Sequence, residues 1–464
     1  MTDEPLVPRA PDAPADLVLT GGTVHLVDDA ASTAHAIAIR GGLVVAHDGE
    51  ASDLASTARR VVHLDGRTVV PGINDAHLHA AWLGARWPSL FFGDHDAAHE
   101  EAGPLVSTAE ERRAALRRAW RLIASLGITS YTEPGIGPGE DDGRTGCFGT
   151  PMLEAYLELH RTGAQTSRVT LLRLFGTIDG ESDLDDFRRG IDAPVPATDA
   201  RWLAIPGVKI FADGIPPLRT AWVREPYTDG TSGALLTRGG ASALDAFRQM
   251  VRLAHERDLQ IAVHATGDRS IDEFLRVLEE LQAEDTLPRR HPHYVVHADL
   301  AFDDLLERMH RIGVGASVQP LIAAFTHAWA SAQLGAERAR LAWPLGRMLD
   351  IGALTTVTSD APIATPDWRE SLDAAVRLLA DGGTPDDAGL RTALLRAITV
   401  DAARQDGAAD WKGSLTRGRA GDLCVLSGDP LRPGRRARDL DVELTVVGGR
   451  VVFERGVTSG VDDT

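Results

Sequence analysis

The sequence predicts an α/β protein: a (β/α)8 barrel of the TIM type, with a small β-sandwich domain formed from the N- and C-terminal segments. Between residues 71 and 411, eight short apolar segments alternate with amphipathic helical segments. This alternation implies parallel strands, and eight such units in about 340 residues fit a closed barrel. Short β-rich runs separated by glycine turns occur at both ends of the chain. These terminal runs predict the small β-sandwich domain.

The two ends of the chain share one pattern. Residues 17–70 contain runs such as LVLT, TVHLV and LVVAH, and residues 412–458 contain VELTVV and RVVFE around a Gly-Gly pair. Each part is short for a stable domain alone, so we expect them to pair into one β domain; the alternative is two separate small domains. Residues 1–16 are acidic and rich in proline, without the basic and apolar regions of a signal peptide. We predict a disordered tail there.

The barrel elements can be assigned in order along residues 71–411. The expected strands are 73–77, 128–133, 169–175, 208–212, 261–264, 294–297, 314–318 and 355–359. Three helical segments show apolar residues at spacings of three and four, around residues 115–126, 244–254 and 271–281. Gly127 directly after the first of these is a typical helix stop.

Composition and charge exclude several classes of function. The chain has 464 residues and a net charge of −19, which argues against binding to nucleic acid or to an anionic membrane. Its two cysteines exclude a disulfide framework and a thiolate zinc cluster. No apolar run reaches the roughly 20 residues that span a bilayer. We expect a cytoplasmic protein that acts on a small molecule and forms a homodimer, since dimers are the commonest oligomers.

Polar side chains stand where the predicted barrel strands end, and this edge of a barrel carries catalytic groups. The first strand ends in two histidines separated by one residue, a lysine lies in the fourth, histidines end the fifth and sixth, and an aspartate follows the eighth. These residues are His77, His79, Lys209, His264, His297 and Asp360.

This set of side chains suits a metal. In an extended segment, residues i and i+2 point the same way, so His77 and His79 can bind one ion. Zinc favours imidazole nitrogen and carboxylate oxygen. Asp360 has two interpretations, a metal ligand that also transfers protons, or the N-cap of a helix near residue 368. Lys209 also has two interpretations. It is either a carboxylated side chain that bridges two metals or an unmodified lysine near one metal.

The segments that carry these residues resemble the amidohydrolase superfamily, and within it the group that contains N-substituted formamide deformylase. They are PGINDAHLHA (71–80), VKIFADG (208–214), HATGDRSID (264–272), HYVVHADL (293–300) and TSDAPI (358–363). The similarity extends over nearly the whole chain, and the motifs occur together in this order.

The resemblance implies a role for each residue. His77, His79 and Asp360 would bind the more buried metal, and His264 with His297 would bind the second. Carboxylated Lys209 would bridge the two metals. One or two zinc ions per subunit would activate a hydroxide that hydrolyses a C–N bond of an amide or N-substituted formamide, with Asp360 as acid and base. The alternatives are a deaminase, a cyclic amide or imide hydrolase or cyclase on the same site, and a metal-free scaffold protein.

Three further residues are candidates for substrate binding. Arg219 follows a Pro-Pro turn after the fourth strand, where it could clamp a substrate carboxylate or remain solvated. Glu133 ends the second strand, where it could reach the site or pair with an arginine. His95 lies after the first histidine pair and could line the pocket or the surface.

Overall fold

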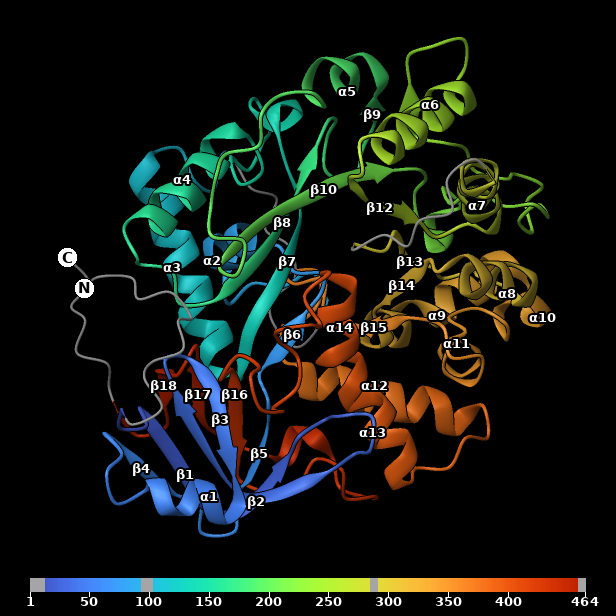
Figure 1. The fold of residues 1–464 in the computed structure, drawn as a ribbon. Coiled ribbons are helices and arrows are strands. Elements are labelled where there is room, and N and C mark those ends of the chain that lie inside the picture. The colour runs from blue at the N-terminus through green and yellow to red at the C-terminus, as the bar shows by residue number, and fades with distance from the viewer. Residues whose placement is uncertain (1–12, 93–102, 284–290, 458–464) are drawn as a thin grey trace.

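A computed structural model describes residues 13–92, 103–283 and 291–457 of the chain (Figure 1). Two sheets of eight strands each organise it. One is a parallel sheet that curls into a nearly closed barrel surrounded by helices, and the other is built from both ends of the chain. The predicted fold class is therefore confirmed.

The barrel sheet contains all eight segments that the sequence predicts as its strands. In order they are β6 (Ile73–Asp75), β7 (Ile128–Ile136), β8 (Arg168–Leu174), β10 (Leu203–Phe211), β12 (Gln260–Ala265), β13 (Tyr294–His297), β14 (Gly315–Val318) and β15 (Thr355–Val357). Every neighbouring pair along this path is parallel. Just beyond β6 and β15, a parallel bridge joins Leu78 to Ala361 and brings the two edges of the barrel together.

Helices cover the outside of the barrel (Figure 1). The longer ones are α3 (Ala109–Ser125), α4 (Thr150–Arg161), α6 (Ala243–Glu256), α7 (Asp268–Gln282), α8 (Asp303–Ile312), α9 (Pro320–Leu334), α12 (Trp368–Asp381) and α13 (Ala388–Ala397). The helix α3 starts with a capping box in which Thr108 and Glu111 bond each other's backbone amides. Gly127 follows it at a φ of +80°, as the stop signal predicts.

Shorter elements connect these units. They are α1 (Asp48–Leu54), α2 (Ala80–Arg86), α5 (Leu184–Gly190), α10 (Ala336–Ala339), α11 (Leu345–Asp350) and α14 (Val400–Gln405), the turns η1 (Pro138–Glu140), η2 (Pro216–Leu218) and η3 (Ala437–Asp439), and the strand pair β9 (Ser182–Asp183) and β11 (Thr237–Arg238). Within the described ranges, each helix is too short or too polar to cross a bilayer.

The second sheet combines strands from opposite ends of the sequence, which appear in blue and red in the lower part of Figure 1. Its strands are β1 (Leu17–His25), β2 (Thr33–Arg40), β3 (Leu43–His47), β4 (Val61–His63), β5 (Thr68–Pro71), β16 (Leu423–Leu426), β17 (Val442–Val447) and β18 (Arg450–Glu454). The two groups of strands meet where β5 pairs antiparallel with β16. Val69 and Val425 lie opposite each other in this pair and belong to its apolar core.

Arg168 connects the sheet to the barrel. Its guanidinium, on β8, donates two hydrogen bonds to Asp422 at 2.6 and 3.0 Å, and Asp422 directly precedes β16. The rings of Trp202 and Trp411 lie 4.6 and 5.0 Å from the guanidinium carbon. Both partners of this ion pair are buried, so removal of one would leave the other charge unpaired in the interior.

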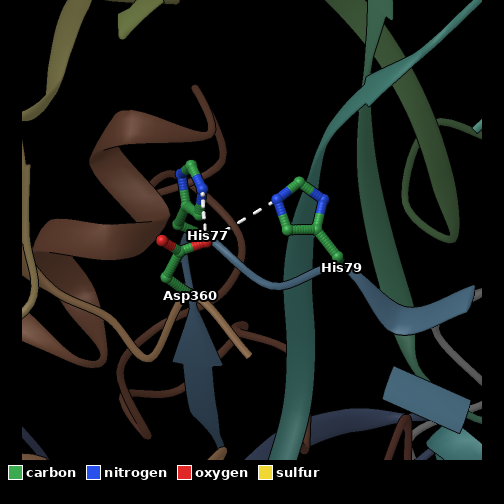
Figure 2. A group of neighbouring side chains, drawn as sticks. All are labelled: His77, His79 and Asp360. Atoms are coloured by element: carbon green, nitrogen blue, oxygen red, sulfur yellow. Dashed lines mark ion pairs between the residues drawn. The ribbon is translucent and has the colours of Figure 1, made fainter. Parts of the chain in front are cut away.

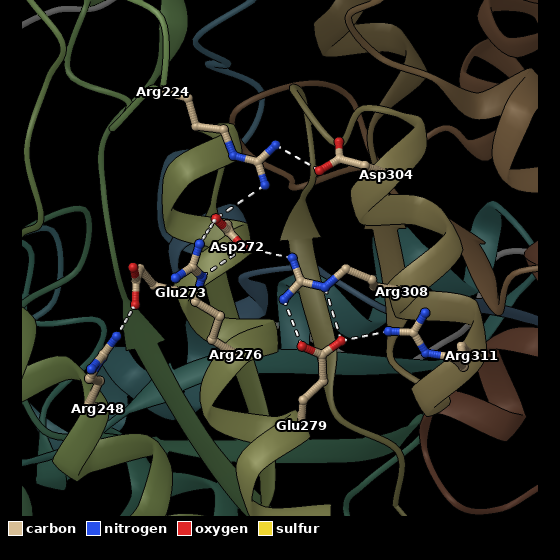
Figure 3. A network of polar contacts seen from close by, with 9 residues as sticks. All are labelled: Arg224, Arg248, Asp272, Glu273, Arg276, Glu279, Asp304, Arg308 and Arg311. Atoms are coloured by element: carbon tan, nitrogen blue, oxygen red, sulfur yellow. Dashed lines mark hydrogen bonds and ion pairs between the residues drawn. The ribbon is translucent and has the colours of Figure 1, made fainter.

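The helices α7 and α8 are joined by an ion-pair network (Figure 3). Asp272 of α7 accepts hydrogen bonds from Arg276 and Arg308, and its carboxylate lies 3.2 Å from Arg224. Glu279, about two turns along α7, receives two more hydrogen bonds from Arg308. Because Arg308 lies on α8, the network fixes the two outer helices against each other.

Candidate metal centre

The six side chains predicted to form the site converge at one end of the barrel. They follow or end strands β6, β10, β12, β13 and β15, and all six line a single pocket of about 360 Å³. Parallel strands bring their carboxyl ends to the same rim, which explains how residues so distant in sequence meet. The six are His77, His79, Lys209, His264, His297 and Asp360.

The most compact part of the site consists of His77, His79 and Asp360 (Figure 2). Nε2 of His77 lies 3.1 Å from Oδ1 of Asp360, and Nε2 of His79 lies 3.6 Å from the same oxygen. All three residues are buried, and one ligand atom from each lies within 4.8 Å of the others. Two imidazole nitrogens and a carboxylate oxygen in this arrangement match the ligands that zinc prefers.

The histidine pair is positioned differently from the sequence argument. We expected His77 inside the first strand, but β6 ends at Asp75. Oδ1 of Asp75 accepts hydrogen bonds from the backbone amides of His77 and Ser359, at 3.3 and 3.1 Å. The amide of Asp360 in turn donates to the carbonyl of His77 at 2.9 Å. Hydrogen bonds across the barrel seam, rather than the strand pleat, therefore hold both histidines toward Asp360.

Glu133 lies behind His79. Its buried carboxylate accepts hydrogen bonds from Nδ1 of His79 at 3.0 Å, from the amide of Ala80 at 2.9 Å and from the hydroxyl of Tyr156 at 2.9 Å. Burial lowers the pKa of His79, but the hydrogen bond and charge of Glu133 outweigh this and raise it overall. A carboxylate on Nδ1 fixes the tautomer that leaves Nε2 free to bind a metal.

Lys209, His264 and His297 form the other side of the site. The rings of His264 and His297 are 4.5 Å apart, and that of His297 is 5.7 Å from His77. Burial lowers the pKa of His297 to about 3 and that of His264 well below its ordinary value. Burial also lowers the pKa of Lys209 to about 8. The two imidazoles are thus biased toward the neutral form that binds a metal.

Two residues of the site have strained backbones. His297 and Asp360 have φ angles of +73° and +56°, in the left-handed region that non-glycine residues rarely adopt. Such conformations are concentrated at functional sites, where the surrounding structure enforces them. The alternative helix-cap role of Asp360 is not observed, since Asp367 caps the helix that follows.

The three further candidates lie in different places. Glu133 contacts His79 instead of a substrate space or an arginine. Arg219 points elsewhere, with its guanidinium bonded to Asp229 at 2.8 Å and to Gln333. His95 lies outside the described residues.

Sequence reasoning missed several polar residues of the pocket, among them Gln319 and Asp179. Gln319 follows β14, and its side-chain oxygen lies 2.8 Å from Nδ1 of His297, so it orients that ring as Glu133 orients His79. A search of every predicted strand end for polar residues would have found it. Asp179 also lines the pocket, but it lies in a loop well beyond the end of β8, where the strand pattern gives no signal.

Comparisons with known proteins agree with this architecture. A model of the amidohydrolase family matches residues 92–453. The putative amidohydrolase YtcJ of Bacillus subtilis is 28% identical over 257 residues, which cover 53% of this chain and 47% of YtcJ. N-substituted formamide deformylase of Arthrobacter pascens is 26% identical over 258 residues, which cover 53% of this chain and 45% of that enzyme. The matched region thus spans about half the length of these two curated relatives.

A solved structure shows the same fold. The crystal structure of an uncharacterised metal-dependent hydrolase from Pyrococcus horikoshii OT3 superposes with a TM-score of 0.71 at 20% identity. The superposition covers 91% of this chain and 99% of that one. Both the barrel and the sheet built from the chain ends are therefore included in the shared architecture.

Proposed function

Because the chain belongs to the amidohydrolase family, we propose that it is a zinc-dependent hydrolase that cleaves the C–N bond of an amide or an N-substituted formamide. Members of this family are hydrolases that act on C–N bonds. The observation that carries the proposal is the buried group of His77, His79 and Asp360 at the rim of the barrel, with ligand atoms within 4.8 Å of one another. The similarity to N-substituted formamide deformylase supports the choice of bond.

The side chains present fit a metal. Glu133 accepts a hydrogen bond from Nδ1 of His79, and Gln319 accepts one from Nδ1 of His297. Nε2 of each ring therefore remains available to bind a metal. We assign His77, His79 and Asp360 to a first ion, and His264 and His297 to a second. When bound, zinc would lower the pKa of a coordinated water and polarise the substrate carbonyl.

Lys209 would complete the site as a carboxylated bridge. Its side chain is buried, and no ion pair with a carboxylate is found for it among the described residues. The lowered pKa makes the neutral amine accessible near pH 8. The amine attacks carbon dioxide to give a carbamate and one proton, and the carbamate supplies two oxygens that share one negative charge. Dependence of activity on added bicarbonate would test this assignment.

Asp360 has the position required of the acid and base. Its carboxylate lines the pocket beside both histidines, so it can accept a proton from the attacking water and deliver it to the leaving nitrogen. The same site could also attack an amidine or a cyclic imide. The products distinguish these reactions, since deamination releases ammonia whereas formamide hydrolysis releases an amine and formate.

One screen tests the proposal. Zinc-loaded protein is incubated with N-formyl amines, N-acyl amino acids and cyclic imides, and amine, ammonia and formate are measured. Formate and amine from N-formyl substrates are the expected products. Ammonia alone would replace the proposal by a deaminase. Protein purified without added metal is analysed in parallel, and complete absence of metal together with no turnover would indicate the scaffold alternative.

A further inference from the structure

We propose, on the basis of the function proposed above, that Asp179 binds a positively charged group of the substrate and so selects cationic amides. Asp179 lines the same pocket as the six candidate metal and catalytic residues, and it is exposed to solvent there. Its charge acts on His79, Lys209 and Asp360, yet none of them forms an ion pair with it within the described structure. It therefore faces the centre across a gap that a substrate can occupy.

The loop after β8 presents this carboxylate. Thr177 accepts a hydrogen bond from Gly180 at 3.3 Å, which closes a tight turn with Asp179 at its third position. Asp179 has a φ of +51°, a conformation that Asp and Asn tolerate better than most residues. The amide of Ile178 donates to Glu140 at 2.7 Å, and this bond anchors the turn to η1. The position of Asp179 is thus fixed by its neighbours.

Among the four aspartates that line the pocket, Asp179 is the one without a partner in the described residues. Asp213 accepts hydrogen bonds from three backbone amides and a serine hydroxyl. Asp299 is bonded to the side chain of Trp343, and Asp360 contacts His77 and His79. Asp179 therefore has the capacity to accept hydrogen bonds from a ligand.

The remaining pocket wall favours a cation over an anion. Lys209 is the one lysine of the described lining, which contains no arginine, and we have assigned Lys209 to the metal site. No cationic side chain of the described wall then remains to pair with a substrate carboxylate. The aromatic rings of Trp82, Phe91 and Trp343 provide apolar surface for a hydrocarbon portion. The net charge of −19 also attracts cations and repels anions.

The test compares substrates that differ in one charge. N-formyl diaminoalkanes of increasing length serve as cationic substrates, N-formyl alkylamines as neutral ones and N-formyl amino acids as anionic ones. We expect the wild type to prefer the best cationic amide over its neutral match by about tenfold or more in kcat/KM, as a hydrogen bond to a charged group provides. In Asp179→Asn the ratio of kcat/KM for the cationic amide to that for the neutral amide should fall to nearly one, mainly because the KM for the cationic amide rises.

A control variant removes the same charge from the same loop. Glu181 is exposed, pairs with Arg238 at 3.4 Å and is not among the described residues of the pocket wall. Glu181→Gln should keep the cationic-to-neutral ratio within about twofold of wild type, because its carboxylate does not face the substrate. An equal loss of kcat for both substrates in Asp179→Asn would assign Asp179 to the chemistry instead, and an unchanged ratio would remove it from recognition. Either result overturns the proposal.

Binding measurements separate this inference from the proposed function. If zinc-loaded protein hydrolyses neither the N-formyl substrates nor the N-acyl amino acids, the proposed function fails. Calorimetric titration of the cationic and neutral amides into the same protein then tests Asp179 alone. Tighter binding of the cationic amide that disappears in Asp179→Asn supports the inference, and equal binding of both amides refutes it.

Discussion

Substitution of Glu133 by glutamine should weaken metal binding without any change to a proposed ligand. The Glu133 carboxylate accepts three hydrogen bonds, from His79 Nδ1 on one oxygen and from the Ala80 amide and the Tyr156 hydroxyl on the other. A glutamine has one oxygen and one NH2 group, so it cannot accept on both sides. Two orientations of the amide are therefore available to Glu133→Gln, and each has a cost.

The two orientations predict different losses. If the amide oxygen faces His79, its NH2 group meets the Ala80 amide donor to donor, and the buried donor left unpaired costs about 1–3 kcal/mol of folding free energy. If the NH2 group faces His79, it donates to Nδ1 and shifts the ring proton to Nε2, the atom directed at Asp360. Loss of such an orienting partner typically lowers metal affinity about 10- to 100-fold.

Competition with a chromogenic chelator measures zinc affinity, and urea unfolding of the metal-free protein measures stability. Glu273→Gln is the matched control, because Glu273 is also buried but pairs with Arg248 on the outer helices. It should leave zinc affinity unchanged. A Glu133→Gln protein with wild-type zinc affinity and wild-type stability would refute the role of Glu133 in fixing His79.

Three further changes have defined outcomes. Asp360→Asn should retain metal by elemental analysis but lose at least about 100-fold in kcat, and near-normal turnover would exclude a proton-transfer role. His77→Ala should lower the bound metal per chain, whereas unchanged stoichiometry would contradict its assignment as a ligand. Burial of Asp272 opposes its ionisation, but hydrogen bonds from Arg276 and Arg308 lower its pKa from 3.8 to about 2. Asp272→Asn should therefore lower the free energy of unfolding in urea by about 1–2 kcal/mol at neutral pH, and this loss of stability should be fully present above pH 3.8 and disappear as the pH falls toward 2. The control Asp304→Asn, at the exposed end of the network, should cost under about 0.5 kcal/mol. A pH-independent loss of stability in Asp272→Asn would contradict the ionic origin.

The barrel could be predicted from sequence because its strands are short, apolar and regularly separated by amphipathic helices. Parallel strands place their carboxyl ends at one rim, so His264 and His297 could be assigned to one site from their positions alone. The bounds of the first strand were less accurate. β6 ends at Asp75, whose side chain accepts a hydrogen bond from the backbone of Ser359, a partner that no local pattern reveals.

The roles of single polar residues depended on contacts that are distant in sequence. A carboxylate at a strand end has the same local pattern whether it faces a substrate or a histidine ring, so Glu133 could not be assigned to His79. Arg219 bonds Gln333, which lies on α9, and is not among the described residues that line the pocket. Asp179 reaches the pocket through a loop turn, and helix or strand periodicity does not extend to such turns.

The pairing of β5 with β16 determines the order in which the protein can assemble during translation. β5 also pairs with β1, so its other edge is unsatisfied until β16 leaves the ribosome, after the whole barrel has been synthesised. Open strand edges associate with other chains. Premature termination before β16 would thus yield an aggregation-prone fragment, and a peptide carrying the last three strands would be the complementing partner that restores it.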